Sequence, residues 1–249
     1  MKDQGRVNKI LGIRVTWRPD GSIRIDQTAY TKAIIKESEM EDCKHQQLPI
    51  SPSLNLDDNI SPQLRREEHA RYRELIGKTS FLAIGTRIDI QFTVNRLSQY
   101  LSEPRRVHLA ALHHLLRYLR WTIRYAITYK PGTKGSDNKL VGFADTSYGN
   151  ARDHQSTSRY VFIITGGPVS WMSRKQPLTA LSTTKAEYIA AADAAKQAIW
   201  LRHFLYAIYK HRVYDNSPTK LQMSPKKPTE LGINNQGTLV IATNPVMHS

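Results

Sequence analysis

The sequence predicts an α/β protein in which a mixed β-sheet with flanking helices follows a mainly helical region that begins with a β-hairpin. Three observations support this class. Short β-rich runs alternate with turn residues, longer stretches carry apolar residues at helical spacing, and a Gly-, Pro- and Ser-containing segment at 131–138 separates the two patterns. The chain has 249 residues, 40% of them hydrophobic, which is enough for one large core or two small ones. We therefore expect two domains, residues 1–135 and residues 138–249.

The first expected element is the β-hairpin. Residues 10–17 (ILGIRVTW) and 22–26 (SIRID) alternate apolar and polar side chains, as strands with one buried face do. The segment RPDG at 18–21 supplies the Pro and Gly of a turn between them. The two strands are therefore expected to pair with each other.

Four helices are expected after the hairpin, because apolar residues recur there every three or four positions. They occupy residues 28–38, two pieces within 65–101 of which the second runs from Ile90 to Leu101, and residues 106–121. Residues 43–63 are rich in Pro, Ser, Asp and Asn without periodicity, so an extended connector is expected. The apolar stripes predicted to face inward are Tyr72, Leu75, Ile76, Thr79 and Leu82 in one helix, and Leu109, Leu112, Leu115, Leu116 and Leu119 in the last.

The second domain is expected to contain an antiparallel meander, a long helix, a further strand and a short helix. Three short apolar runs joined by tight turns predict the meander. Alanines inside the long helix permit close packing on a sheet, and Ser182 is a candidate for its N-cap. In chain order, these elements are strands at 140–145, 159–165 and 169–174, a helix from about 183 to 209, a strand at 229–234 and a helix at 235–244.

This order of elements is that of a ribonuclease H-like domain. The chemistry of such a domain needs carboxylates that converge at the sheet, so that two Mg²⁺ ions about 4 Å apart can bind between them. Asp145 ends the first strand of the meander, Glu187 lies in the first turn of the long helix, and Asn234 ends the last strand. We therefore expect these three side chains to meet at one edge of the sheet.

The magnesium site predicted by this pattern is a weakened one. Asn234 can lend a metal one neutral amide oxygen, but it supplies no charge to hold two dications. Each residue also has an ordinary structural interpretation: Asp145 fits a turn, Glu187 suits the N-terminal end of a helix dipole, and Asn234 fits a loop. From spacing alone both interpretations stay open.

The charge of the chain favours a polyanionic partner. Lys and Arg number 36 against 21 for Asp and Glu, so the formal net charge is +15, and nucleic acid is the commonest partner of such a protein. A solvated helix surface is the alternative interpretation of the basic residues around 106–121. The candidates for contacts with phosphates are Arg105, Arg106, Arg117, Arg120 and Arg124.

Composition excludes several classes of protein. No run approaches the roughly 18 apolar residues of a transmembrane helix, and the N-terminal MKDQGRVNKI lacks the apolar stretch of a signal peptide. The single cysteine, Cys43, excludes an internal disulfide framework and a cysteine zinc cluster. We expect a cytoplasmic or nuclear protein that is not secreted and has no membrane partner.

Seven stretches spread over the chain carry a resemblance to a known family. They are FLAIGTRIDIQFTVNRLSQY at 81–100, HLAALHHLLRYLRWT at 108–122, LVGFADTSYGN at 140–150, STSRYVFIITGGPVSWMSRKQ at 156–176, ALSTTKAEYIA at 180–190, WLRHFL at 200–205 and NNQGTLVIATNPVMH at 234–248. With these motifs in this order, the chain resembles the Ty1/copia family of retrotransposon Pol proteins over nearly its whole length.

The resemblance implies a role for each part. Residues 1–135 would be the C-terminal, thumb- or connection-like region of a reverse transcriptase, and residues 138–249 an RNase H-like domain that is incomplete at its C-terminus. By similarity, Asp145 in FAD and Glu187 in AEY are metal-binding carboxylates, and Asn234 in NNQG stands where the family has an aspartate. The implied cofactor is Mg²⁺, and the implied partners are RNA–DNA hybrid or other nucleic acid and other element-encoded proteins.

Departures from the family pattern predict a loss of activity. The polymerase carboxylate motif is not in this sequence, so no polymerase activity is expected. Lys185 stands where the family has an acid and would oppose metal binding, whereas Ile88 in place of a proline is expected to be neutral. We expect a transposable-element endonuclease of RNase H ancestry that is catalytically impaired. The alternatives are a nucleic-acid-binding remnant with no catalysis and a non-functional pseudogene product.

Overall fold

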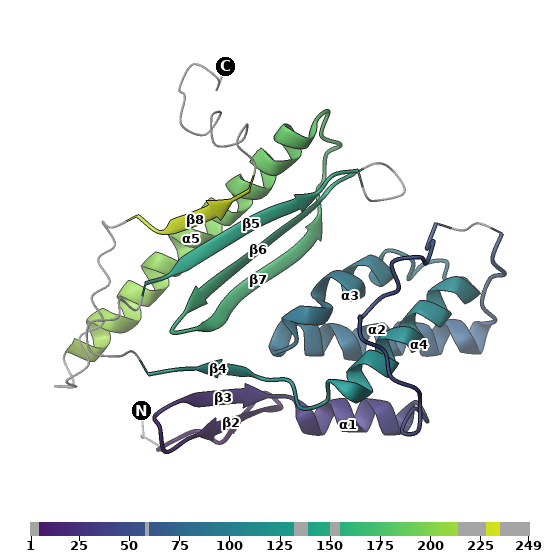
Figure 1. Ribbon diagram of the computed structural model, residues 1–249, viewed down its shortest axis with the longest axis horizontal. Coiled ribbons are helices and arrows are strands. Elements are labelled where there is room, and N and C mark those ends of the chain that lie inside the picture. The colour runs from purple at the N-terminus through teal and green to yellow at the C-terminus, as the bar shows by residue number, and fades with distance from the viewer. Residues whose placement is uncertain (1–4, 58–59, 132–138, 150–154, 214–227, 235–249) are drawn as a thin grey trace. The chain divides into compact units, whose positions relative to one another are not determined.

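The computed structural model describes residues 5–57, 60–131, 139–149, 155–213 and 228–234, with side chains as far as 208 in the fourth of these ranges. The chain divides into two compact units, Met1–Thr128 and Tyr129–Ser249 (Figure 1). The expected domain limits at 135 and 138 stay predictions, because residues 132–138 lie outside the described part of the chain.

The sheet of the first unit contains the predicted hairpin and two further strands. The strand predicted at 10–17 is wrong at residues 11–12, where Leu11 and Gly12 have positive φ and form a turn. The hairpin strands β2 and β3 pair antiparallel, and Gly21 in the turn between them adopts a positive φ of 78°, which suits a residue without Cβ. The sheet order is β1-β2-β3-β4, and β4 was not predicted, since three residues show no alternation. The strands are β1 (Lys9–Ile10), β2 (Ile13–Trp17), β3 (Ile23–Asp26) and β4 (Ile127–Tyr129).

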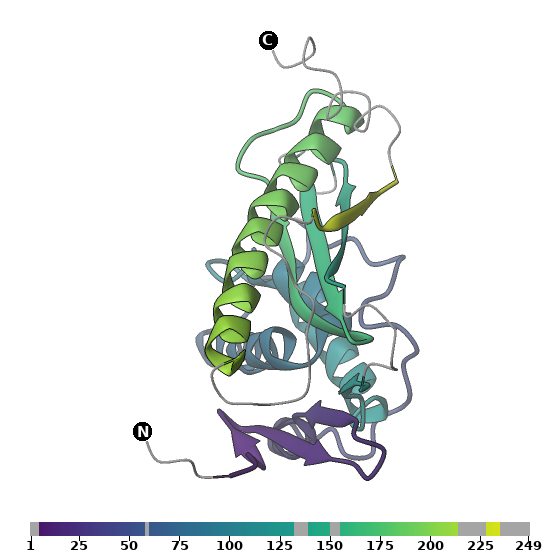
Figure 2. The same cartoon turned by 90° about the vertical axis from the view of Figure 1, so that its left-hand side faces the viewer.

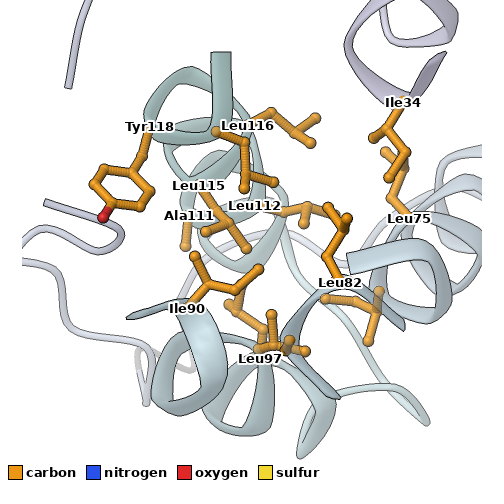
Figure 3. Packing of buried hydrophobic residues seen from close by; sticks show 14 of the residues in the cluster. Ile34, Leu75, Leu82, Ile90, Leu97, Ala111, Leu112, Leu115, Leu116 and Tyr118 are labelled. Atoms are coloured by element: carbon orange, nitrogen blue, oxygen red, sulfur yellow. The ribbon is translucent and has the colours of Figure 1, made fainter. Parts of the chain in front are cut away.

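Four α-helices and one short 3₁₀ helix form the core of the first unit. The predicted inward stripes are confirmed: Leu112, Leu115 and Leu116 are completely buried, and each such side chain contributes about 1.5–3 kcal/mol by leaving water. Figure 3 shows these leucines meeting side chains from the other helices. The helices are α1 (Thr28–Glu37), α2 (Arg66–Gly85), η1 (Ile88–Ile90), α3 (Gln91–Ser98) and α4 (Arg106–Trp121).

The sheet of the second unit is mixed, as predicted. Its order is β7-β6-β5-β8, with β8 parallel to β5 and the other neighbours antiparallel. Thr165 and Gly166, which join β6 to β7, both have positive φ, the backbone of a tight two-residue hairpin turn. The strands are β5 (Val141–Ser147), β6 (Thr157–Ile164), β7 (Gly167–Lys175) and β8 (Glu230–Ile233).

One long helix, α5 (Thr183–Val213), lies along a face of this sheet (Figure 2). Ser182 caps it as predicted, because the Ser182 hydroxyl accepts a hydrogen bond from the backbone N–H of Lys185 at 3.2 Å. Small side chains at Ala194 and Ala198 let the helix approach Phe162 of β6 closely, so the two layers share one core. The sheet thereby fixes the position of the N-terminal end of α5, near which Glu187 lies.

The predicted α/β class is confirmed, with two sheets and five α-helices among the described residues, and the second unit is compatible with an RNase H-like fold. Four elements of the second unit run further than predicted: β5 continues to Ser147 and α5 to Val213, β6 begins at Thr157, and β7 extends at both ends to Gly167–Lys175. The helix expected at 235–244 lies outside the described residues. Among the described helices, none has the length and apolar character needed to cross a membrane.

Candidate functional site

Asp145 and Asn234 lie side by side at one end of the second sheet. Parallel pairing places Ala144 of β5 opposite Ile233 of β8, so the next residues, Asp145 within β5 and Asn234 directly after β8, are neighbours. The Nδ2 atom of Asn234 points toward Oδ1 of Asp145 at 3.5 Å, the distance of a long hydrogen bond in which the amide donates. The amide therefore presents an N–H to the carboxylate.

Glu187 joins this pair from near the N-terminal end of α5. Its side chain is only 7% exposed, and its carboxyl group accepts a hydrogen bond from the backbone N–H of Thr146. Burial, and then the negative charge of Asp145, raise the pKa of the Glu187 carboxyl above its ordinary value, and the Thr146 hydrogen bond opposes this shift. Oε2 of Glu187 is buried and has no hydrogen-bond partner among the described residues.

A cation that the sequence analysis missed lies at the same edge. Antiparallel pairing puts Arg159 of β6 directly opposite Asp145, and the two side chains share a face of the sheet. The Arg159 guanidinium lies 3.9 Å from Oδ2 of Asp145 and donates a hydrogen bond to the hydroxyl of Ser147. Only the register of β5 on β6 could have revealed this neighbour.

Gln176 holds the site in place through hydrogen bonds, and its role was also missed by the sequence analysis. It follows β7 directly, is 2% exposed, and its Nε2 donates to the Ala186 carbonyl at 2.8 Å and to the Ser158 hydroxyl at 2.9 Å. Because Ala186 precedes Glu187, these bonds tie the first turn of α5 to the sheet. No local sequence signal marks it, since Gln176 follows the charged residues Arg174 and Lys175 at the end of β7.

The described donor atoms do not fit a pair of Mg²⁺ ions. Such ions require several charged oxygen ligands, and within the described part of the chain no group of three or more His, Cys, Asp or Glu side chains comes together. Asp145 instead faces the guanidinium of Arg159 and the amide N–H of Asn234. The arrangement can hold one cationic group beside Asp145, and Arg159 already supplies one.

The five predicted phosphate-binding arginines fall into two groups. Arg105 and Arg120 hold the connector that precedes α2, since they donate to the backbone carbonyls of Ser61 and Glu41, each at 2.8 Å. These two therefore also have a structural role.

Of the other three arginines, Arg106 and Arg124 are exposed and Arg117 is half-buried. Arg106 and Arg117 are spaced to share one face of α4, and Arg124 is exposed in the turn that follows the helix. Arg106 lies 3.4 Å from a carboxylate oxygen of Glu68, whereas the side chains of Arg117 and Arg124 make no hydrogen bond or ion pair with the residues that the structure describes. Arg117 and Arg124 are therefore the better placed to contact a phosphate.

Comparison with known proteins extends the likeness over the whole chain. The chain is 31% identical over 234 residues to the retrovirus-related Pol polyprotein from transposon TNT 1-94 of Nicotiana tabacum, which aligns 90% of this chain with 17% of that protein. It is 30% identical over 250 residues to the Pol polyprotein from transposon RE1 of Arabidopsis thaliana, covering 100% and 16%, respectively. It is 34% identical over 199 residues to a transposon Ty5-1 protein of Saccharomyces cerevisiae, covering 79% and 63%.

The chain thus spans about a sixth of the two plant polyproteins and somewhat less than two thirds of the yeast protein. No protein-family model and no solved structure matches it. The similar proteins are transposon products from plants and yeast, and the alignments run through both structural units. On this similarity, the chain belongs to the Ty1/copia-type retrotransposon Pol polyproteins and corresponds to a segment of them.

Proposed function

We propose that this segment of a copia-type Pol polyprotein binds RNA–DNA hybrid and that its RNase H-like domain is catalytically impaired. Residues 138–249 are the proposed RNase H-like domain. Residues 1–135 are the proposed thumb- or connection-like end of the reverse transcriptase. The two parts would contribute different things: the first a basic surface, the second a site descended from a nuclease.

The observation that carries the proposal is the meeting of Asp145, Glu187 and Asn234 at one edge of a mixed sheet. Asn234 lies 3.5 Å from Asp145, and the charge of Asp145 acts on Glu187. Two of the three are carboxylates, which supports descent from a metal-dependent nuclease. Replacing one carboxylate of a two-metal site by an amide costs several kcal/mol of transition-state stabilisation, or more than about a thousandfold in rate.

The binding part of the proposal rests on charge. With a net charge of +15, the chain attracts the phosphate backbone, and each phosphate that a cation neutralises releases counterions from the nucleic acid. Arg117 and Arg124 are the proposed contacts, because their side chains lie at or near the surface without a partner among the described residues. Affinity should therefore fall steeply as salt increases.

A titration of labelled RNA–DNA hybrid at several salt concentrations, followed by fluorescence anisotropy, tests the binding. Arg117→Gln and Arg124→Gln should each weaken binding and lower the salt slope by about 1. Arg71→Gln is the matched control, since Arg71 is engaged with Glu74 at 2.8 Å and should leave the slope unchanged. If the affinity of the native chain hardly changed with salt concentration, the proposal that binding is electrostatic would be wrong.

A residual ribonuclease is the second candidate function, because Asp145 and Glu187 still come together. A cleavage assay with end-labelled hybrid in Mg²⁺ or Mn²⁺ separates it from binding alone. We expect no cleavage of the RNA strand above background. Cleavage by the native chain that disappears in Asp145→Asn would contradict the proposal that the domain is catalytically impaired, and would establish a nuclease activity.

A further inference from the structure

We propose that Arg159 is the resident cation of the Asp145 site, so that the native chain does not bind a divalent cation there, and that removing Arg159 opens a site for one such ion. The inference rests on the proposed nuclease descent of this site. It concerns cation binding alone and makes no use of nucleic-acid binding.

The strand register is the first support. Arg159 and Asp145 are direct partners across β5 and β6, so their Cβ atoms stay within about 5.5 Å of each other whatever rotamers they adopt. The guanidinium lies 3.9 Å from Oδ2 of Asp145 and is held in the same place by its hydrogen bond to the Ser147 hydroxyl. A metal ion binding Oδ2 would have to occupy the space of the guanidinium.

The second oxygen of Asp145 is also engaged by a donor. Asn234 directs its Nδ2 toward Oδ1 at 3.5 Å. A carboxylate that faces a guanidinium on one oxygen and an amide N–H on the other has a cation beside it and a donor on each oxygen, although both contacts are long and partly exposed. Both groups would have to be displaced, or the amide turned over, before Asp145 could bind a metal ion.

Glu187 provides an independent sign that a cation once completed the site. Its side chain is more than nine-tenths buried, and Oε2 has no hydrogen-bond partner among the described residues. A buried oxygen without a partner is costly and calls for an explanation, such as an ion that the site was built to hold. Arg159 pairs with Asp145, whereas this Glu187 oxygen has no hydrogen-bond partner among the described residues. This is the pattern expected if Arg159 replaced an ancestral metal ion only on the Asp145 side of the site.

Direct titration of Mn²⁺ into the full chain by isothermal calorimetry tests the proposal. Mn²⁺ alone is the probe, and the variants are Arg159→Gln, which keeps an unbranched polar side chain, and Arg159→Thr, which suits a strand. Both should bind one Mn²⁺ at least about tenfold more tightly than the native chain, because they remove a positive charge about 4 Å from the ligand oxygen in a partly exposed site. Arg159→Lys keeps the charge and should behave like the native chain.

Two further variants locate the effect. Adding Asp145→Asn to Arg159→Gln should abolish the gained Mn²⁺ binding. Arg174→Gln removes another ion-paired arginine of the same sheet, 3.4 Å from Asp193, and should gain nothing. Circular dichroism shows whether each variant is folded, and having two replacements at Arg159 keeps the test available if one of them is not.

The proposal is overturned if the native chain binds one Mn²⁺ as tightly as Arg159→Gln and loses it in Asp145→Asn. It is also overturned if neither folded Arg159 variant gains Mn²⁺ binding. Loss of hybrid binding in the salt titration would refute the proposed function while leaving these calorimetric results unaffected, so the two failures are distinguishable.

Discussion

The Arg87–Asp89 pair of the first unit and the Arg159–Asp145 pair of the second use the same two side-chain types in opposite settings. Arg87 is 2% exposed, binds Asp89 with two nitrogens at 2.7 and 2.9 Å, and also donates to the Thr122 carbonyl. In the second pair the side chains are 35% and 47% exposed and 3.9 Å apart.

This difference in burial and distance indicates different roles. The Arg87–Asp89 pair stabilises the fold, whereas the Arg159–Asp145 pair lies in the candidate site. Around Arg87, Tyr118 donates its hydroxyl to Asp89 at 2.8 Å and lies with its ring beneath the guanidinium, so the group is bonded on several sides. A buried charge satisfied in this way is expensive to disturb. Around Asp145 the bonds are long and water has access, so the partner of the carboxylate can be exchanged at little cost to stability.

The largest effect should come from breaking the buried pair. Arg87→Ala leaves Asp89 without its main partner and empties the largest fully buried side-chain position, so the free energy of unfolding should fall by about 3–5 kcal/mol. Urea denaturation followed by circular dichroism measures the change. Arg71→Ala removes a surface pair and should cost less than about 1 kcal/mol. Equal losses in the two variants would show that burial does not distinguish these pairs.

A smaller loss of stability should follow from removing the hydrogen bonds of Gln176, which hold the start of α5 next to the Asp145 site. Gln176→Met keeps roughly the size of the side chain but removes two hydrogen bonds, one to the Ser158 hydroxyl and one to the Ala186 carbonyl, and should cost about 1–3 kcal/mol in urea denaturation. The exposed Gln63, which donates to Glu103, provides the control, and Gln63→Met should change stability by less than about 0.5 kcal/mol. A Gln176 variant as stable as the native chain would mean that the first turn of α5 is held by apolar packing alone.

Removing the partly exposed Arg159–Asp145 pair should change the free energy of unfolding very little. Arg159→Gln is expected to change the free energy of unfolding by less than about 1 kcal/mol, because the pair is long and both partners are partly exposed. The same urea experiment applies. A loss as large as that of Arg87→Ala would make Arg159 a structural residue and erase the contrast between the two pairs.

The smallest expected effect is on the pH dependence of stability, through the carboxyl group of Glu187. Its pKa is raised chiefly by burial, so the folded state holds this proton more tightly than the unfolded chain does. Stability should therefore decrease as pH rises from the unfolded pKa through the folded pKa, and the loss should persist above it. Glu187→Gln should flatten that part of the stability curve and raise stability at its upper end. Glu39→Gln, at an exposed carboxylate, controls for the loss of one negative charge, and an unchanged slope in Glu187→Gln would contradict the prediction.

Much of the fold followed from local patterns. The heptad-like leucine spacing in α4, the alternation in β2 and β3, and the Gly-containing turn before β7 are each readable within a few residues, because helical and strand periods repeat locally. β4 escaped prediction for the opposite reason. Its three residues become a strand only because the sheet of the first unit offers a free edge about 100 residues earlier in the chain.

Local patterns predicted most of the elements in their order, the inward faces of the helices, the resemblance to the family, and the candidate trio Asp145, Glu187 and Asn234. The neighbours of that trio, Arg159 opposite Asp145 and Gln176 beside the start of α5, are visible only in the folded chain. The physical reason is that alternation assigns a side chain to a face of a sheet but leaves the register open, since a slip of two residues keeps every face and changes every neighbour.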